Sequence, residues 1–358
     1  MRTHHPFVVT SLIAMLAVAL SAGYARSEPA YTVCVSNERG GDVSVIDAAK
    51  GEVVATIPVG KRPRGIHTSP NGRLLYVALS GRKIEGPPKL DAQGNPILHK
   101  DDDDDDSTTD HAADGIAMVD LASQKVVKKL PAGSDPEQFA VDPNGACLYT
   151  SNEDVGTMSV TDVTTGKVEH IVPVAREPEG VSFTPDGKTV YVTCETNGDI
   201  FAIDVATHKV RAHFNVPGRP RSVVFLPDGA RGVIPSESSG MLSLFDVKQN
   251  KVIKTLRLPT GSRPMGLVVS PDGRTVFATT GRGGTVLAVD PEKFEVTATI
   301  KVGKRPWGIA ISPDGKKLYV ANGPSNDVSV VDVAQEKEIG RIKCGQSPWG
   351  VTVVSTHE

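Results

Sequence analysis

The chain has 358 residues, of which 23% are charged and 5% are aromatic, and its formal net charge at pH 7 is −3. This near-neutral balance gives no support for a nucleic-acid partner. The 35 glycines and 26 prolines favour short strands joined by tight turns over long helices.

Residues 1–25 are predicted to be a signal peptide. Arg2 precedes the apolar run FVVTSLIAMLAVAL, and small residues follow that run before Ala25. A membrane anchor is the alternative, but the run is shorter than the ~20 residues that a membrane span needs. We therefore expect cleavage near Ala25, export to the periplasm, no membrane span in the mature chain, and a single domain over residues 26–358.

The rest of the chain is a repeat. Asn-Gly or Asp-Gly turns recur at intervals of about 42 residues, and one interval is longer by about 31 residues. In the repeat that begins at Arg305, four short segments have the composition of strands: residues 308–312, 317–321, 327–333 and 338–344. Units of this length with four strands are typical of propeller blades.

We count seven strands of each of the four kinds, so the predicted fold is all-β: a seven-bladed β-propeller of four-stranded blades. The repeats begin with a strand of the second kind, YTVCVS, and they finish with one of the first kind, WGVTVVS. The C-terminal strand is therefore expected to join the N-terminal blade and close the ring, which leaves no open sheet edge at the junction.

The segment SPDGKKLYVAN, followed by DVSVVDV, resembles the YVTN family of propeller repeats over nearly the whole mature chain. The opening YTVCVSNERGGDVSVIDAAKGEVVATIPVGKRPRGI and the acidic insertion before DGIAMVDLA resemble the periplasmic β-propellers associated with catabolism that depends on pyrroloquinoline quinone (PQQ). The resemblance implies a PQQ-dependent dehydrogenase or an ABC transporter component as a partner. It implies no particular reaction, because a fold does not fix a function.

Strands of a blade run alternately up and down, so two sets of loops share one face, which we call the top face. These are the proline-centred loops that lead into each blade and the loops that follow each second strand. The insertion, about residues 81–114, occupies a loop of the second set and contains six consecutive aspartates. Such a run is typical of a solvated, flexible loop, and cation capture and docking to a basic partner are the alternatives.

Two neighbouring blades place six carboxylates on the top face. Hard cations such as Ca²⁺ or a lanthanide ion prefer six or more oxygen ligands. We therefore predict a metal site formed by Asp135, Glu137, Glu153, Glu177, Glu179 and Glu195. The alternative is that these carboxylates form salt bridges to the arginines of the flanking blades, Arg62, Arg64, Arg219 and Arg221.

The remaining blades place arginines and tryptophans on the same face. Guanidinium groups form bidentate pairs with carboxylates, and indole rings stack on flat ligands. A planar polycarboxylate such as PQQ is therefore a candidate cofactor. The predicted cofactor-binding residues are Arg219, Arg221, Arg263, Arg305, Trp307 and Trp349. The alternative is that the tryptophans cap the central channel while the arginines stay solvated.

A catalytic role is the less favoured interpretation. YVTN-like propellers resemble certain lactonases and lyases, and His67 is a weak catalytic candidate because other repeats have small or apolar residues at its position. We find no G-x-S-x-G or H-E-x-x-H motif. The sequence thus favours a periplasmic binding or accessory protein of PQQ-dependent alcohol oxidation, with a lactonase- or lyase-type enzyme and a protein scaffold as alternatives.

Overall fold

The computed structural model describes Met1 and residues 31–84 and 109–355. The predicted signal peptide and the aspartate run lie outside the described residues. Within these ranges, no helix is long and apolar enough to cross a membrane.

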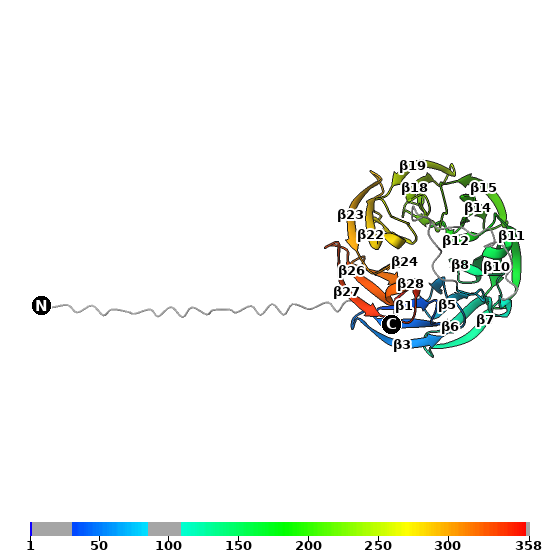
Figure 1. Cartoon of the computed structure of the whole chain (residues 1–358), viewed down its shortest axis with the longest axis horizontal. Helices are drawn as coiled ribbons and strands as arrows, with labels where there is room; N and C mark the ends of the chain where they lie inside the picture. Colours follow the sequence, from blue (N-terminus) through cyan, green and yellow to red (C-terminus); the bar gives the residue numbers. More distant parts are fainter. Residues whose placement is uncertain (2–30, 85–108, 356–358) are drawn as a thin grey trace, which may run out of the picture.

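Seven four-stranded antiparallel sheets form a closed ring, which confirms the predicted seven-bladed propeller (Figure 1). From the channel outward, the first blade contains β28 (Pro348–Ser355), β1 (Tyr31–Asn37), β2 (Asp42–Asp47) and β3 (Glu52–Pro58). The second contains β4 (Ile66–Thr68), β5 (Leu74–Leu79), β6 (Gly115–Asp120) and β7 (Lys125–Leu130). The third contains β8 (Pro136–Val141), β9 (Cys147–Asn152), β10 (Thr157–Asp162) and β11 (Val168–Pro173).

The other four blades repeat this order. The fourth contains β12 (Pro178–Phe183), β13 (Thr189–Cys194), β14 (Asp199–Asp204) and β15 (Lys209–Asn215). The fifth contains β16 (Val224–Phe225), β17 (Arg231–Ser236), β18 (Met241–Asp246) and β19 (Lys251–Arg257). The sixth contains β20 (Leu267–Val269), β21 (Val276–Thr279), β22 (Thr285–Asp290) and β23 (Glu295–Lys301), and the seventh contains β24 (Pro306–Ile311), β25 (Lys317–Asn322), β26 (Asp327–Asp332) and β27 (Lys337–Lys343).

Burial falls from the second strand of a blade to its outermost strand. Every residue of β13 is buried, whereas β15 is mostly exposed. The reason is that neighbouring blades cover both faces of the middle strands, whereas the outermost strand borders solvent. The middle strands therefore consist of nearly continuous runs of apolar residues.

The ring closes as predicted. The C-terminal strand β28 pairs with β1 in antiparallel register, with Val33 opposite Val353. A hydrogen bond of 2.9 Å between the hydroxyl groups of Tyr31 and Tyr319 adds a contact between the first and seventh blades. Residues from the two ends of the described chain thus complete one blade.

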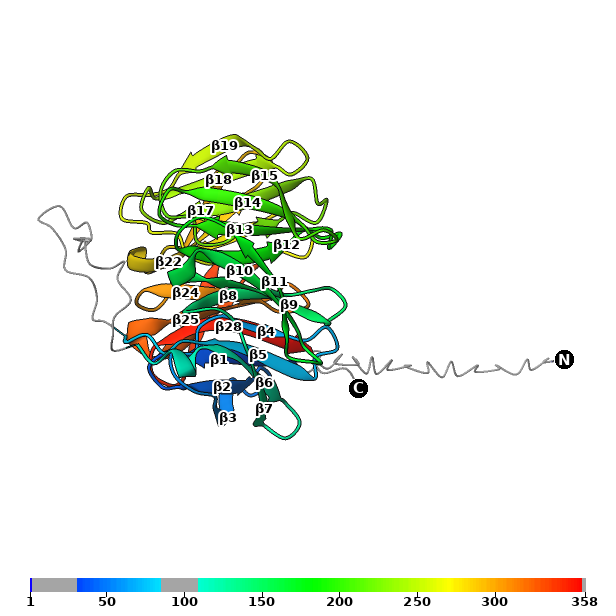
Figure 2. The same cartoon turned by 90° about the vertical axis from the view of Figure 1, so that its right-hand side faces the viewer.

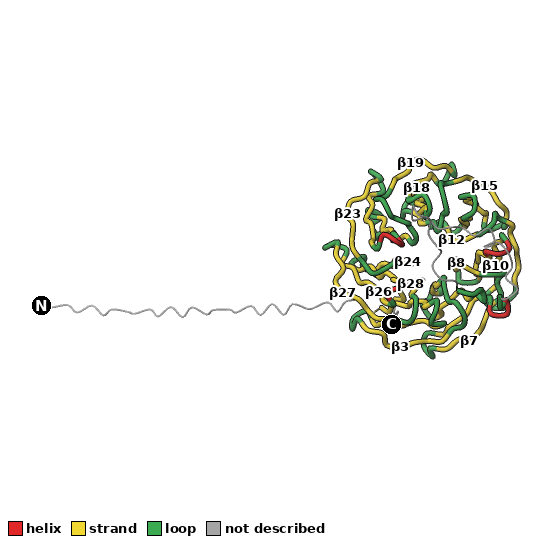
Figure 3. Tube along the Cα trace, in the orientation of Figure 1, coloured by secondary structure: helices red, strands yellow, loops and turns green. Residues whose placement is uncertain are grey.

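Among the described residues, four short 3-10 helices lie in the loops that follow second strands. They are η1 (His111–Ala113), η2 (Glu153–Val155), η3 (Gly281–Gly283) and η4 (Gly323–Ser325). Figure 2 shows η1, η2 and η3 on one side of the ring, and Figure 3 marks helical segments in red. This side is the top face.

Candidate functional site

The proline-centred loops have a shared backbone geometry that positions the acids of the top face. The residue before the proline has a positive φ in five of the seven loops: Arg62 (45°), Asp135 (46°), Glu177 (52°), Arg305 (50°) and Ser347 (58°). A positive φ strains a non-glycine residue by about 1–3 kcal/mol. Five such residues in equivalent positions show that the fold imposes this conformation.

The carbonyl of this residue also fixes the second set of loops. Asp135 O accepts a hydrogen bond of 3.2 Å from Glu153 N, and Glu177 O accepts one of 2.9 Å from Glu195 N. The same bond joins Arg219 O to Glu237 N at 2.9 Å. Each glutamate is therefore held beside the loop that leads into its own blade.

We call the first group of charges the Arg64 cluster; it consists of Arg62, Arg64, Arg82, Asp135, Glu137 and Glu153. Arg64 lies at its centre, 1% exposed, with Nη2 at 2.5 Å from Asp135 Oδ1. Its Nη1 is also paired with Glu137 and lies 3.8 Å from Glu153 Oε2. Arg64 belongs to the second blade and the three acids belong to the third, so the ion pairs cross the interface between blades.

Two further arginines border the same acids. Arg62 Nε donates to Glu38 Oε1 at 3.0 Å, and its Nη1 lies 3.6 Å from Asp135 Oδ1. Arg82, whose side chain is 31% exposed, lies 3.3 Å from Asp154 Oδ1 and 3.6 Å from Asp135 Oδ2. Three guanidinium groups therefore surround one buried carboxylate.

Two of the three carboxyls of this cluster have pKa values shifted in opposite directions. Burial opposes ionisation of Asp135, but the charges of Arg64 and Arg62 outweigh it and hold its pKa well below the ordinary value. Burial and the neighbouring Asp135 carboxylate raise the pKa of Glu153 to about 8. At neutral pH, Glu153 is thus mostly a protonated acid beside an ionised aspartate.

We call the second group of charges the Arg221 cluster; it consists of Glu179, Glu195, Arg219, Arg221 and Glu237. Arg221 is paired with Glu179 and Glu195, and its Nη2 lies 2.6 Å from Glu237 Oε2. Arg219 is also paired with Glu195. The pairs with Glu179 and Glu195 cross the interface between the fourth and fifth blades, whereas Glu237 belongs to the fifth blade, as Arg221 does.

Burial also decides the protonation of the Arg221 cluster. Burial raises the pKa of Glu195 well above its ordinary value despite the nearby Arg221. For Glu237, burial is outweighed by Arg221 and Arg219, which lower its pKa. The Glu195 side chain is 0% exposed, whereas that of Glu153, at the equivalent position of the neighbouring blade, is 17% exposed. Of these two acids with raised pKa values, Glu153 is the one that a ligand can reach.

An aromatic pair lies across the channel mouth from the acids. The rings of Trp307 and Trp349 are 5.5 Å apart at 31°. The guanidinium carbon of Arg305 lies 5.1 Å from the centre of the Trp307 ring. That of Arg221, which belongs to the fifth blade, lies 5.7 Å from the same centre. Cation–π contact on this ring therefore links the aromatic pair to the Arg221 cluster.

The ends of the insertion are anchored beside the Arg64 cluster. Gly81 N donates to Asp114 Oδ1 at 2.7 Å, and Lys61 pairs with Asp110 at 2.6 Å. Asp114 Oδ2 also accepts from Asp135 N at 3.4 Å. The expected position of the insertion, next to the acidic blades, is confirmed for its described ends.

The six predicted metal ligands lie on the top face but not in one group. The Arg64 cluster contains Asp135, Glu137 and Glu153, the Arg221 cluster contains Glu179 and Glu195, and Glu177 lies outside both. Arginines pair closely with four of these acids: Asp135, Glu137, Glu179 and Glu195. Glu153 lies 3.8 Å from Arg64, and Glu177 accepts a hydrogen bond of 2.7 Å from Thr196. In the described part of the chain, no three histidine, cysteine, aspartate or glutamate side chains are grouped to hold a metal ion. The ion pairs fit the salt-bridge alternative, and a hard-cation site formed by these six residues stays a prediction.

The predicted cofactor-binding residues are partly brought together. Arg221, Arg305, Trp307 and Trp349 form one surface, while Arg219 is paired with Glu195 and Arg263 donates to Ser238 O at 3.2 Å. The contribution of Arg82 was missed by the sequence reasoning. Its position directly after the second strand of its blade was the available signal, because the other loops of that set supply the acids.

His67 lies on β4, away from the charged clusters. Its ring packs edge-on against Phe139 at 4.9 Å. Burial lowers its pKa to about 4, and a hydrogen bond with Gln138 opposes this shift only in part. A neutral, weakly basic imidazole between an aromatic ring and an amide fits a structural residue better than a catalytic one.

Comparison with known proteins supports the propeller fold and finds a partial match to one family. The sequence profile described as "Lactonase, 7-bladed beta-propeller" matches residues 178–343, which comprise the fourth to seventh blades. No curated protein sequence matches the chain.

Solved structures of low sequence identity share the propeller. A putative 6-phosphogluconolactonase from Bacteroides fragilis has a TM-score of 0.71 and 17% identity, with 92% of this chain and 99% of that chain covered. A protein of unknown function from Desulfotomaculum acetoxidans has a TM-score of 0.73 and 12% identity, covering 91% and 99%. Kuenenia stuttgartiensis hydrazine synthase has a TM-score of 0.66 and 21% identity, covering 82% and 95%. The chain is therefore a seven-bladed β-propeller similar in part to the lactonase family.

Proposed function

We propose that the chain is a lactonase-type hydrolase whose reaction takes place in the Arg64 cluster. The observation that supports this most is Glu153, a partly exposed carboxyl with a pKa of about 8 beside three guanidinium groups. A general base is most effective when its pKa lies near the operating pH. The partial match to the lactonase family supports the same class of reaction.

The proposed reaction needs one group that accepts a proton and returns it. Ionised Glu153 takes a proton from water, whose oxygen attacks the carbonyl carbon of the lactone. The ring C–O bond then breaks, and protonated Glu153 gives the proton to the ring oxygen, so the product is a hydroxy acid. Hydrolysis of this kind consumes one water molecule and needs no other reactant.

The arginines supply the electrostatic part of this mechanism. The carbonyl oxygen gains negative charge when water adds, and a fixed positive charge stabilises it most in a site shielded from water. Arg82 is the candidate for this contact because its side chain is 31% exposed, whereas Arg64 is 1% exposed and bound by carboxylates.

The test is hydrolysis of a panel of lactones, including glucono-δ-lactone, 6-phosphogluconolactone and γ-butyrolactone. The release of acid measures the rate of each reaction. We expect kcat to rise with pH and to level off above about 8, and we expect Glu153→Gln to lower it by about 10²–10⁴-fold. Glu195→Gln is the matched control, because it removes the equivalent buried acid that no substrate reaches. Wild-type rates equal to spontaneous hydrolysis for every lactone, or equal losses in both variants, would contradict the proposal.

A second candidate function is the binding or accessory role in periplasmic PQQ-dependent alcohol oxidation, alongside a dehydrogenase or a transporter component. The specific observation in its favour is the surface of Trp307, Trp349 and Arg305. A flat polycarboxylate stacks on an indole ring and pairs with a guanidinium, and within the described residues no carboxylate lies within ion-pair distance of Arg305. Trp307 and Arg305 are the residues expected to hold PQQ, which itself supplies the redox chemistry.

A further inference from the structure

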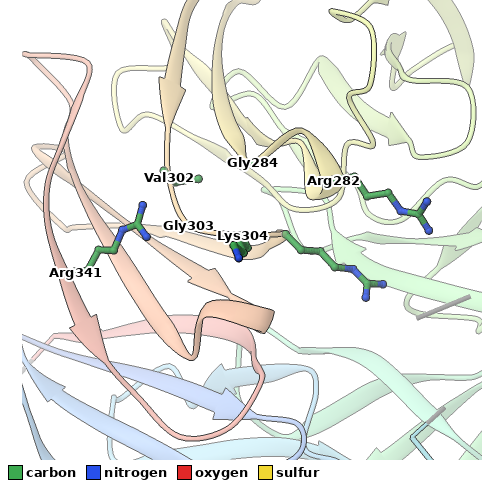
Figure 4. A pocket seen from close by; sticks show the side chains of 7 residues that line it. Arg282, Gly284, Val302, Gly303, Lys304 and Arg341 are labelled. Atoms are coloured by element: carbon green, nitrogen blue, oxygen red, sulfur yellow. The ribbon is translucent and has the colours of Figure 1, made fainter. Parts of the chain in front are cut away.

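We propose that a pocket between the sixth and seventh blades binds small multivalent oxyanions, either free or as the anionic group of a larger molecule. The pocket has a volume of about 560 Å³, within the ~300–1,000 Å³ range typical of small-molecule sites. It is lined by Arg282, Gly284, Val302, Gly303, Lys304, Arg305 and Arg341 (Figure 4).

The lining of this pocket is strongly basic. Four of its seven residues are positively charged and none is acidic. They come from three separate elements: Arg282 from η3, Lys304 and Arg305 from the loop into β24, and Arg341 from β27. In Figure 4, Arg341 points toward Val302 and Gly303, and Arg282 lies on the other side of the pocket.

Nearby acids neutralise part of this charge. Glu338 pairs with Arg341 through two contacts of 2.8 and 3.1 Å. Asp327 lies 4.0 Å from Arg341 and is shared with Lys343 at 3.8 Å. Across residues 31–84 and 109–355, no carboxylate forms an ion pair with Lys304 or Arg305, so the pocket keeps a net positive charge.

Burial and repulsion from two nearby arginines both disfavour the positive charge of Arg305. Burial lowers the pKa of Arg305, and the neighbouring charges of Arg282 and Arg221 lower it further, although Glu237 acts in the other direction. A bound anion removes this repulsion and replaces water around the guanidinium with charge-assisted hydrogen bonds. An oxyanion with two or more charges suits a pocket whose cations come from different elements.

The floor of the pocket is rigid. Gly303 approaches Asn322 so closely that a Cβ at this position would lie 2.4 Å from Asn322 Cγ. The backbone N–H of Gly303 donates to Ser329 Oγ at 3.2 Å, and that of Lys304 donates to Ser325 Oγ at 2.8 Å. Since these backbone donors are already engaged, the side chains of Lys304, Arg305 and Arg341 are the groups that recognise the anion.

The pocket is separate from the proposed hydrolytic residue. Glu153 belongs to the third blade, on the opposite side of the ring from the strands β23 and β26 that flank the pocket (Figure 1). The inference therefore does not depend on the proposed lactonase activity.

The test is isothermal titration of the protein with sodium pyrophosphate and with glucose 6-phosphate at low and moderate salt. We expect saturable binding of one anion per chain. The double variant Lys304→Gln, Arg341→Gln should weaken binding at least tenfold. The matched control is Lys337→Gln, Lys343→Gln, which removes the same charge from β27 outside the pocket and should change affinity less than twofold.

The outcomes separate the possible sources of the anion. Binding of pyrophosphate supports a site for a free oxyanion, whereas binding of glucose 6-phosphate alone supports recognition of the anion as part of a larger molecule. Absence of saturable binding of either probe overturns the proposal. Equal weakening in the pocket variant and its control also overturns it, because binding would then follow overall charge.

Discussion

The guanidinium of Arg64 and the carboxylate of Asp135 form an ion pair that is closed to solvent. Their Nη2–Oδ1 distance is 2.5 Å, and the two side chains are 1% and 0% exposed. They lie 71 positions apart in the sequence and in neighbouring blades. The pair therefore joins two blades while holding Asp135 ionised beside the protonated Glu153.

Removing one partner of this buried pair is expected to be costly. Arg64→Met leaves Glu137 buried without its arginine partner and Asp135 without the nearest of its three arginines, and breaking a buried pair in this way costs about 3–5 kcal/mol. Urea unfolding of the variant measures this loss in the free energy of unfolding. The control is Arg274→Met, whose 86% exposed side chain lies 3.9 Å from Asp272, and which should cost less than about 1 kcal/mol. Similar values for the two variants would mean that the Arg64 cluster does not stabilise the fold.

The stability of the protein should depend on the ionisation of Glu153. Its folded-state pKa of about 8 lies above the unfolded value of about 4.3, so its contribution is fully present below that unfolded value and is lost as the pH rises toward 8. Glu153→Gln cannot ionise. We therefore expect the free energy of unfolding of the wild type, relative to this variant, to fall by roughly 2–4 kcal/mol between pH 4.5 and pH 8.5.

The measurement is urea unfolding of both proteins at four pH values across that range. Glu52→Gln, at an exposed position of β3, is the control and should show no such trend. A constant difference between wild type and Glu153→Gln at all pH values would show that Glu153 titrates as it does in water, and would also remove the main support for its role as a general base.

The tryptophan pair offers a direct test of the PQQ-binding candidate. The chain has 2 tryptophans, Trp307 and Trp349, so its tryptophan emission reports on this surface alone. We expect PQQ to quench the emission in a saturable manner and Trp307→Ala to weaken binding about tenfold, consistent with the ~0.5–1.5 kcal/mol of a stacking contact added to lost buried area. Trp307→Phe should retain most of the affinity. If the loss of emission is fully explained by PQQ absorbing the exciting or emitted light, without saturation, PQQ does not bind at this surface and the candidate function is contradicted.

Calcium and lanthanide titrations address the carboxylates that the sequence assigns to a metal. Because Arg221 already pairs with Glu179 and Thr196 donates to Glu177, we expect Glu177→Gln with Glu179→Gln to leave any Ca²⁺ or La³⁺ affinity unchanged. Calorimetry of wild type and variant makes the comparison. Stoichiometric binding tighter than about 10⁻⁵ M that disappears in the variant would restore the metal site on the blades.

The architecture could be predicted from the amino-acid sequence alone. Blade number, strand order and ring closure follow from a repeat of turns and alternating strands, and these are local patterns whose meaning does not depend on distant residues. The same pattern placed the proline-centred loops and the loops after second strands on one face. It therefore located the acids of the third and fourth blades and the arginines that flank them.

Which of these charges form pairs, and which of them a ligand can reach, depends on how the blades pack together and could not be predicted from the repeat. Glu153 and Glu195 occupy equivalent positions in the repeat, yet one side chain is 17% exposed and the other 0%. The difference arises because neighbouring blades bring different arginines over them. Arg221 likewise reaches Trp307 across the channel mouth, and Arg341 lines a pocket with residues of the sixth blade. A repeat fixes the position of a residue within its blade, but protonation and ligand access depend on distances and burial between blades, which only the packed ring sets.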